Sequence, residues 1–284
     1  MIVADEALWS RDWPAPAKLN LFLHVVGRRA DGYHLLQTVF RFLDRADSLR
    51  FSPRRDGAVR LTTPLPGVPA DSDLTVRAAR SLQQAAGIAQ GVDIALEKRL
   101  PMGGGLGGGS SDAATVLLAL NRLWRANLSN AELQRLGLAL GADVPIFIHG
   151  CAAFAEGVGE RFTEVSLPPA WYLVAVPKVA VPTQRIFAAP ELRRDTAAIV
   201  PGQWRLGQGG NDLEAVACTL FPEVRRHLDL LGAFGEARMS GSGACVFVDF
   251  DTAAAAEAAA AQLTSDIDAF VARGIDRHPL RELT

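Results

Sequence analysis

Six glycines in seven positions make residues 103–109 the most constraining stretch of this 284-residue chain. A strand-like segment at residues 92–96 precedes them, and an alanine- and leucine-rich segment typical of a helix follows at residues 113–120. Because glycine has no Cβ, successive N–H groups can point into one concavity, which also faces the positive end of the helix dipole. A flexible linker would not run into regular elements on both sides. The loop therefore predicts a binding site for a nucleotide or another phosphate.

The kind of phosphate site follows from what surrounds the glycines. Gly103, Gly105 and Gly108 satisfy the G-x-G-x-x-G fingerprint of dinucleotide-binding folds. That fold also needs an acidic residue at the end of a second strand about 20 positions later, where residues 124–130 predict a loop. The Walker pattern fails too, because no Gly-Lys-Ser/Thr sequence follows. A cation that assists the phosphates must therefore come from elsewhere in the chain.

Lysine is rare in this chain and its positions are informative. Only Lys18, Lys98 and Lys178 stand among the 29 basic residues, and the others are arginines. A compact ammonium and a planar guanidinium are not interchangeable. We therefore expect a lysine in this arginine-rich chain to occupy a site where an arginine would not fit.

The bulk composition excludes several classes of function. With 21% charged residues and a net charge of -2, the chain offers no basic surface for nucleic acid and no polybasic patch for a membrane. No apolar run approaches the roughly 18 residues of a membrane-spanning helix, and the first six residues lack the features of a signal peptide. We therefore expect a cytoplasmic protein with no nucleic-acid or membrane partner. The three cysteines, Cys151, Cys218 and Cys245, predict buried free thiols.

Hydrophobic periodicity predicts an α+β fold in two domains, residues 1–155 and 156–284. On the first expected strand, Lys18 and Asn20 share the face opposite the apolar side chains. A hairpin is expected through Asp56 and Gly57, and the acidic cluster at residues 71–73 is expected to cap a helix. The expected strands are residues 17–27, 38–43, 48–51, 152–155 and 171–176, with a strand-turn unit at 237–248. The expected helices are residues 74–86, 130–140, 183–188, 212–217, 223–231 and 252–263.

Four segments resemble, in order, the motifs of one family. They are residues 16–21 (Pro-Ala-Lys-Leu-Asn-Leu), 30–34 (Ala-Asp-Gly-Tyr-His), the glycine loop and 141–145 (Gly-Ala-Asp-Val-Pro). Together they resemble the GHMP small-molecule kinases, and residues 240–244 (Ser-Gly-Ser-Gly-Ala) are similar to a further motif of that family. The resemblance extends from residue 16 to at least residue 248. It implies a two-domain GHMP-kinase-like fold with the active site in the cleft between the domains.

Within that family the motifs look like those of the branch that acts on a CDP-linked methylerythritol in the non-mevalonate route to isoprenoid precursors. The resemblance thus implies phosphoryl transfer from ATP, with Mg²⁺, to a hydroxyl of that substrate, and it identifies no metal ligand. Asp143 would accept the proton of the attacking hydroxyl. Lys18 would stabilise the Asp143 carboxylate and offset charge on the transferring phosphoryl. The alternatives are a helix N-cap for Asp143 and a surface position for Lys18.

The resemblance also assigns the donor to the glycine loop. Asp112, just beyond it, suits a helix N-terminus but would repel a triphosphate, so we expect it to point away from the metal. Asp73 stands where the family more usually has Asn beside the adenine, so we expect it to accept from the adenine amino group. The residues expected to hold ATP are Pro101, Met102, Gly103, Gly104, Gly105, Leu106, Gly107, Gly108, Gly109, Ser110 and Ser111.

Recognition of the acceptor is carried over to five further residues. Tyr33 and Phe187 would stack on the two faces of the cytosine ring, and His34 would hydrogen-bond its edge. Asn20 and Thr183 would bind the methylerythritol or phosphate portion. Three alternatives stay open: a nicotinamide-dependent oxidoreductase, a nucleotide sensor without catalysis, and another GHMP-type kinase acting on a different small alcohol.

Overall fold

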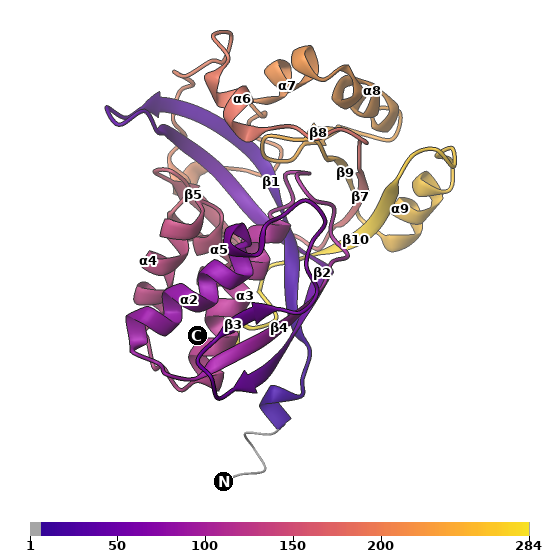
Figure 1. Cartoon of the computed structure of the whole chain (residues 1–284). Coiled ribbons are helices and arrows are strands. Elements are labelled where there is room, and N and C mark those ends of the chain that lie inside the picture. The colour runs from indigo at the N-terminus through magenta and orange to yellow at the C-terminus, as the bar shows by residue number, and fades with distance from the viewer. Residues whose placement is uncertain (1–6, 284) are drawn as a thin grey trace.

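Two long antiparallel strands, β1 (Trp13–Arg28) and β2 (His34–Arg54), run through the molecule from one end to the other (Figure 1). The structure is a computed structural model that describes residues 7–283. The first six residues, on which the expectation about a signal peptide depends, lie outside the described part. The strands expected at residues 38–43 and 48–51 are one continuous strand, because Ala46 and Asp47 between them pair with Pro16 and Ala15 at the start of β1.

The edge of the sheet beside the second half of β2 differs from the prediction. Strand β4 (Gly91–Glu97) pairs with β2, and β3 (Val59–Leu61) lies beyond β4 and parallel to it. The hairpin predicted through Asp56 and Gly57 is therefore wrong. The chain crosses over because Val92 N–H donates to Ala58 O and Gly91 leaves space for that backbone. A short 3₁₀ turn, η1 (Ala70–Ser72), then leads to the first helix of this part.

Four helices cover one face of this part of the sheet (Figure 1). They are α2 (Leu74–Ala86), α3 (Gly108–Leu123), α4 (Asn130–Leu140) and α5 (Val144–His149). The predicted bounds of α2 and α4 are confirmed, and Asp73 caps α2 by accepting from Thr75 N–H. Helix α3 packs directly on β1, and the other three surround it. Its buried alanines and leucines form the centre of the first hydrophobic core.

The second half of the chain extends the sheet on the other side of β2. Strand β10, close to the C-terminus, pairs with β2, and the order continues through β7 and β9 to β8. The strands are β5 (Ala153–Glu156), β6 (Arg161–Glu164), β7 (Trp171–Ala175), β8 (Arg238–Met239), β9 (Val246–Phe250) and β10 (Ala269–Ile275). The boundary suggested at residue 155 falls within β5, and it stays a prediction.

The helices of this half lie around its own hydrophobic core. Helix α7 begins two residues later than predicted because Asp212 bonds to β1 instead, accepting from Val25 N–H and donating its own N–H to Leu23 O. The predicted bounds of α6 are confirmed. The helices are α6 (Thr183–Ala188), α7 (Glu214–Leu220), α8 (Pro222–Leu231) and α9 (Ala253–Ala260), with 3₁₀ turns η2 (Pro201–Gln203) and η3 (Arg281–Leu283). Among the described residues, no helix has the length and apolar character needed to span a bilayer.

Helix α4 packs closely on α5 at one glycine. A Cβ added at Gly137 would lie 2.8 Å from Ile148 Cδ1 and 2.9 Å from Val144 Cγ1, both on α5. We predict that Gly137→Val lowers the free energy of unfolding by about 1–3 kcal/mol, because overpacking forces the two helices apart. Urea denaturation measures the loss.

The matched control for this prediction is Ala139→Val on the exposed face of the same helix. It introduces a valine at an exposed position, so we expect a loss below about 0.7 kcal/mol, the difference in helix propensity. A loss in Gly137→Val no larger than that in the control would contradict overpacking against α5.

Candidate active site

The glycine loop joins β4 to α3 in a conformation that requires glycine. Gly103, Gly105 and Gly107 have φ values of 68°, 76° and 71°, in the left-handed region. A Cβ on Gly105 would lie 2.1 Å from Ser240 O, and one on Gly107 would lie 3.0 Å from Lys18 Cε. Helix α3 starts with Gly107 at its N-cap, where no side chain caps it. The N–H groups of its first turn are therefore available to an anion.

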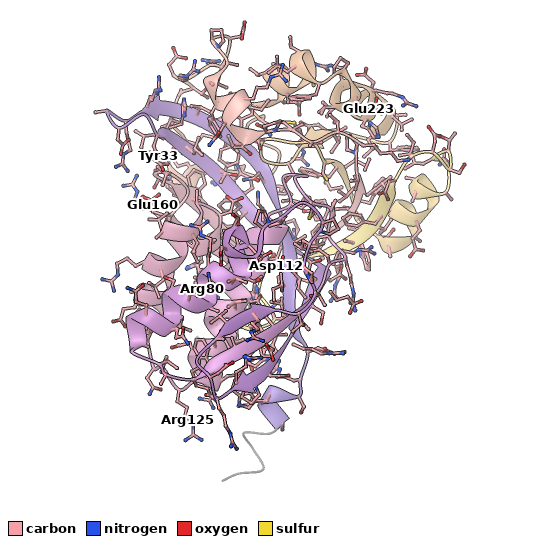
Figure 2. All side chains as sticks on the ribbon, in the orientation of Figure 1. Tyr33, Arg80, Asp112, Arg125, Glu160 and Glu223 are labelled. Atoms are coloured by element: carbon pink, nitrogen blue, oxygen red, sulfur yellow. The ribbon has the colours of Figure 1, made fainter. Side chains whose placement is uncertain are left out.

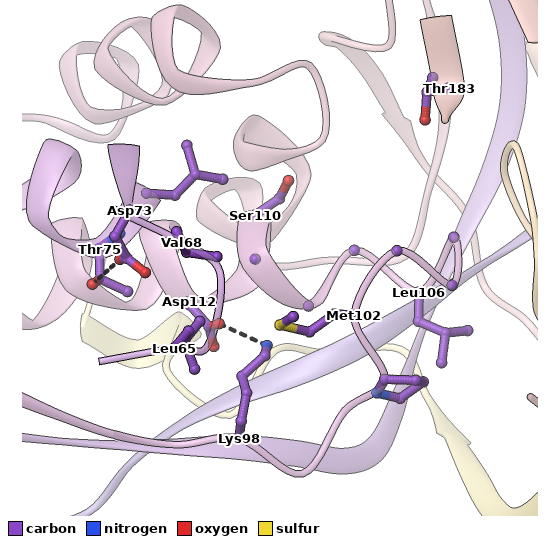
Figure 3. A pocket seen from close by; sticks show the side chains of 18 of the residues that line it. Leu65, Val68, Asp73, Thr75, Lys98, Met102, Leu106, Ser110, Asp112 and Thr183 are labelled. Carbon is purple, nitrogen blue, oxygen red and sulfur yellow. Dashed lines mark hydrogen bonds and ion pairs between the residues drawn. The ribbon is translucent and has the colours of Figure 1, made fainter. Parts of the chain in front are cut away.

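A cavity of about 390 Å³ lies against this loop (Figure 3). Ten of the eleven residues expected to hold ATP line it, from Pro101 through Ser110. Ser111 is instead fully buried, and its hydroxyl has no hydrogen-bond partner in the described part of the chain. Asp73 lines the cavity while one of its oxygens caps α2. The arrangement can hold a phosphate chain between the loop and the start of α3.

A cation that sequence analysis did not place lies in this cavity. Figure 3 shows Lys98 directed at Asp112, and its Nζ donates to Asp112 Oδ2 at 2.8 Å and also to Asp47. Asp47 is fully buried, and its other oxygen accepts from Arg99 N–H and Leu100 N–H at 2.6 and 2.7 Å. The cluster thus ties β2 and the segment before the glycine loop to α3, at its fifth residue. The scarcity of lysine was the one signal that pointed to Lys98.

Burial and charge set the protonation of this cluster. Burial raises the pKa of Asp112 to about 8, and the nearby Asp47 carboxylate adds to the effect against the opposing charge of Lys98. Burial alone would lower the pKa of Lys98, but the carboxylates of Asp112 and Asp47 outweigh it and raise that pKa. With Asp112 protonated, Lys98 and Asp47 form a neutral buried pair. The orientation of Asp112 relative to a metal stays a prediction.

The predicted catalytic pair is brought together in the structure. Lys18 is 2% exposed, and its Nζ lies 3.1 Å from Asp143 Oδ2. The same ammonium donates to Asn20 Oδ1 at 2.6 Å and to Gly105 O at 3.0 Å, and it lies 5.5 Å from the ring centroid of Phe40. Strand alternation places Lys18 and Asn20 on one face of β1, as predicted.

The alternative roles for these two residues do not fit the geometry. Lys18 is not a surface lysine, because its side chain is buried. Asp143 occupies the N-cap position of α5 but makes no capping hydrogen bond with its side chain. The carboxylate faces Lys18 instead and is 38% exposed, so a substrate can reach it.

A second cavity, of about 300 Å³, contains this pair. It shares Gly103, Gly105, Ser110 and Thr183 with the cavity at the glycine loop. Residues from both halves of the chain line it, which places it between the two parts of the molecule. From the second half come Val158, Gly159, Val181, Thr183, Phe187, Leu213, Gly241, Ser242 and Gly243.

A third cavity, of about 510 Å³, adjoins the second and shares Thr183 and Phe187 with it. Tyr33 lines it from the turn between β1 and β2, where this side chain is 64% exposed (Figure 2), and His34 lines it from the first position of β2. The His34 ring stacks on Phe187 with centroids 4.8 Å apart and planes at 30°. Burial lowers the pKa of His34, and the charges of Arg194 and Arg28 lower it further. The three cavities form one continuous row.

The other two residues predicted to bind the acceptor, Asn20 and Thr183, form hydrogen bonds with other side chains of the protein. Asn20 is buried and uses its amide to accept from Lys18 and to donate to Thr38 Oγ1 at 2.9 Å. Thr183 lines all three cavities, and its hydroxyl lies 2.7 Å from Ser242 Oγ. Contact of either residue with a substrate stays a prediction.

Metal-binding side chains do not gather here. Within residues 7–283, no three or more His, Cys, Asp or Glu residues stand together as a metal site would require. The three cysteines are buried and free, as predicted, and burial raises the pKa of Cys245 to about 12.

The buried carboxyl of Asp112 generates a prediction on pH. Its pKa of about 8 lies well above the ordinary aspartic acid value of 3.8, so the folded state holds a proton that the unfolded state releases. Stability therefore falls as pH rises from about 4 to 8, by at most about 1.4 kcal/mol per pH unit from this group. We predict that Asp112→Asn flattens the dependence of the unfolding free energy on pH between 6 and 9.

Asp56→Asn is the control in this comparison. The hydrogen bond from Arg54 lowers the pKa of Asp56 to about 2, so Asp56 does not titrate in that range. The variant should keep the slope of the unmodified protein in urea denaturation at pH 6, 7.5 and 9. An unaltered slope in Asp112→Asn would mean that Asp112 is ionised throughout.

Comparison with known proteins supports the same family for both halves of the chain. The GHMP kinases N terminal domain matches residues 73–151, and the GHMP kinases C terminal domain matches residues 201–268. A 4-diphosphocytidyl-2-C-methyl-D-erythritol kinase of Dechloromonas aromatica is 63% identical over 96% of this chain and 100% of its own length. The enzyme of the same name from Thiobacillus denitrificans is 60% identical over 95% of this chain and 98% of its own length.

Solved structures agree with the sequence relatives. A crystal structure of 4-(cytidine 5'-diphospho)-2C-methyl-D-erythritol kinase matches with a TM-score of 0.81 at 39% identity, over 93% of this chain and 99% of that chain. A mevalonate kinase structure matches with a TM-score of 0.69 at 16% identity, over 94% of this chain and 100% of that chain, which shows the shared fold. The predicted fold class is confirmed, and the alternative of a nicotinamide-dependent oxidoreductase is wrong. The chain belongs to the GHMP kinases, in the family of the 4-diphosphocytidyl-2-C-methyl-D-erythritol kinases.

Proposed function

We propose that this protein transfers the γ-phosphoryl group of ATP to the 2-hydroxyl of 4-diphosphocytidyl-2-C-methyl-D-erythritol, a step of the non-mevalonate route to isoprenoid precursors. The observation that carries the proposal is the row of three cavities. A glycine-lined phosphate site stands at one end, a lysine-carboxylate pair in the middle and an aromatic pocket at the other end. This order matches a donor triphosphate, a reacting hydroxyl and a nucleobase.

The residues of the first cavity fit ATP. A Cβ would collide with Cys245 Sγ at Gly104 and with Ser240 O at Gly105, so the loop keeps this shape only with glycine there. The uncapped start of α3 offers N–H donors to the phosphates. Lys98 adds a cation beside Gly108, since its Nζ would lie 3.0 Å from a Cβ there. We assign the contact with the adenine amino group to the Asp73 oxygen that does not cap α2, because Asp73 also lines this cavity.

A magnesium ion fits this site as a companion of the phosphates. Mg²⁺ in kinases is bound through one or two protein oxygens together with phosphate oxygens and water, so it needs no cluster of side chains. Ser110 lines both the first and the second cavity. Its hydroxyl would therefore lie where the triphosphate passes from the ATP site to the catalytic pair. When bound, the ion neutralises charge on the phosphates.

Asp143 and Lys18 act on the acceptor hydroxyl. Asp143 is exposed enough to accept the hydroxyl proton as the oxygen attacks the γ-phosphorus. Lys18 holds that carboxylate at 3.1 Å and offsets negative charge on the transferring phosphoryl. Lys18 is itself fixed by Asn20 and Gly105, so the charge is in place before the substrate binds.

The aromatic pocket selects the acceptor. We place the cytosine between Phe187 and Tyr33, in the cavity that both side chains line, next to the His34 ring that stacks on Phe187. Stacking of a base on an aromatic ring contributes about 1–3 kcal/mol. Another GHMP-type kinase acting on homoserine or mevalonate would have no base for these rings, which favours the nucleotide-linked alcohol. Thr183 lies between the pocket and the catalytic pair, where the phosphates of the acceptor would pass.

The partners that we propose are therefore small molecules. The cytoplasmic location and the lack of a nucleic-acid partner, expected from composition, stay predictions.

Mass spectrometry of the products tests the function. Incubation with ATP, Mg²⁺ and the CDP-linked methylerythritol should add one phosphoryl group to the alcohol. Asp143→Asn should reduce kcat by about 10²- to 10⁴-fold, because the hydroxyl then loses its proton acceptor.

Asp195→Asn serves as the control because Asp195 is 89% exposed and faces Arg193 rather than a cavity. It should retain full turnover. The absence of a phosphorylated product from the unmodified protein would refute the proposed reaction, whereas full turnover by Asp143→Asn would refute only the role of Asp143.

A further inference from the structure

Arg194 joins the two aromatic walls of the third cavity, although it does not line that cavity. Its Nε donates to His34 Nε2 at 3.2 Å. Its two terminal nitrogens donate to backbone carbonyls, from Nη2 to Phe187 O at 3.0 Å and Ala189 O at 2.7 Å, and from Nη1 to Leu192 O at 2.9 Å. One guanidinium thus holds the first residue of β2 and the C-terminal end of α6 at the same time.

The acceptors around Arg194 are all neutral. Three are carbonyls and one is an imidazole nitrogen, and within residues 7–283 no carboxylate forms an ion pair with this guanidinium. Five fixed donors in one plane match such a set, whereas a lysine has a single ammonium that cannot reach all four acceptors. The carbonyl of Phe187 also belongs to the last turn of α6, where it has no helical partner.

The contact with His34 fixes the state of its ring. Arginine can only donate, so the Nε2 atom that faces it must carry a lone pair. In the neutral ring the proton then resides on Nδ1. The charged groups that act on this imidazole are Arg194 and Arg28, and both oppose its protonation.

We propose that Arg194 is a positioning residue that preassembles the His34–Phe187 stack as the platform for the nucleobase. This inference rests on the proposed function, because the base to be bound is the cytosine of the acceptor. Holding both rings before binding removes the loss of side-chain freedom that would otherwise oppose stacking. Arg194 therefore acts on binding of the base and leaves the phosphoryl transfer step to Lys18 and Asp143.

The first test is spectroscopic and needs no substrate. Protein labelled with ¹⁵N at histidine, with His34 identified by the signal that His34→Gln removes, should show the Nδ1–H tautomer for His34 at pH 7.5. Arg194→Met should convert that signal to the Nε2–H form or to a mixture. An Nε2–H tautomer in the unmodified protein would overturn the inference.

The second test separates binding from chemistry. Arg194→Met should weaken binding of cytidine 5′-diphosphate about 10-fold in calorimetry and raise the KM for the CDP-linked alcohol by a similar factor, with kcat and the affinity for ATP within about twofold. Arg194→Lys, which keeps the charge but not the planar set of donors, should show most of the same loss. If Arg194→Met does not fold, as judged by urea denaturation, Arg194→Lys carries the test.

Arg193→Met is the matched control, because Arg193 is the adjacent arginine, 65% exposed and paired with Asp195. It should leave the His34 tautomer, the binding of cytidine 5′-diphosphate and the KM unaltered. Unaltered binding and KM in both Arg194 variants would overturn the inference. An unmodified protein that phosphorylates no CDP-linked alcohol would refute the proposed function, and the tautomer measurement would still judge the role of Arg194.

Discussion

A single buried ammonium, that of Lys18, sets the geometry on which the rest of the site depends. A buried charge is strongly unfavourable unless it is paired and hydrogen-bonded. Here the acceptors come from three segments far apart in the chain: Asn20 on β1, Gly105 in the glycine loop and Asp143 at the start of α5. Satisfying the charge therefore assembles the site. The same requirement explains Gly107, because any side chain there would collide with the lysine stem.

The parts of the fold that the sequence predicts well are those set by local chemistry. The bounds of α2, α4 and α6 follow from periodicity over a few turns, and capping residues such as Asp73 mark where a helix begins. The phosphate site could likewise be predicted, since the glycine run and the helix after it are contiguous. The pairing of Lys18 with Asp143 could be predicted only from the resemblance to family motifs. In the structure Lys18 Nζ lies 3.1 Å from Asp143 Oδ2.

The features that escaped prediction depend on contacts between distant residues. Asp47 lies within β2, where polar residues look like the end of a strand, and its partners are about 50 positions away. Arg194 lies 160 positions from His34 in a segment without regular structure, and nothing nearby distinguishes it from the other arginines. The hairpin at Asp56 failed for the same reason. Asp56 and Gly57 are typical of a tight turn, but the strand that follows them, β3, pairs with β4 and not with β2.

The fastening of the glycine loop has a thermodynamic consequence. Gly104 O accepts from Cys245 N–H, and Gly105 O accepts from the Ser240 hydroxyl, so the loop is bonded to the second half of the chain as well as to β1. The two halves cannot separate at this point without breaking those bonds. The entropy lost in shaping the cradle is thus spent once, when the chain folds, and not again in every catalytic cycle. More of the binding energy of the nucleotide then remains for aligning its terminal phosphate with the acceptor.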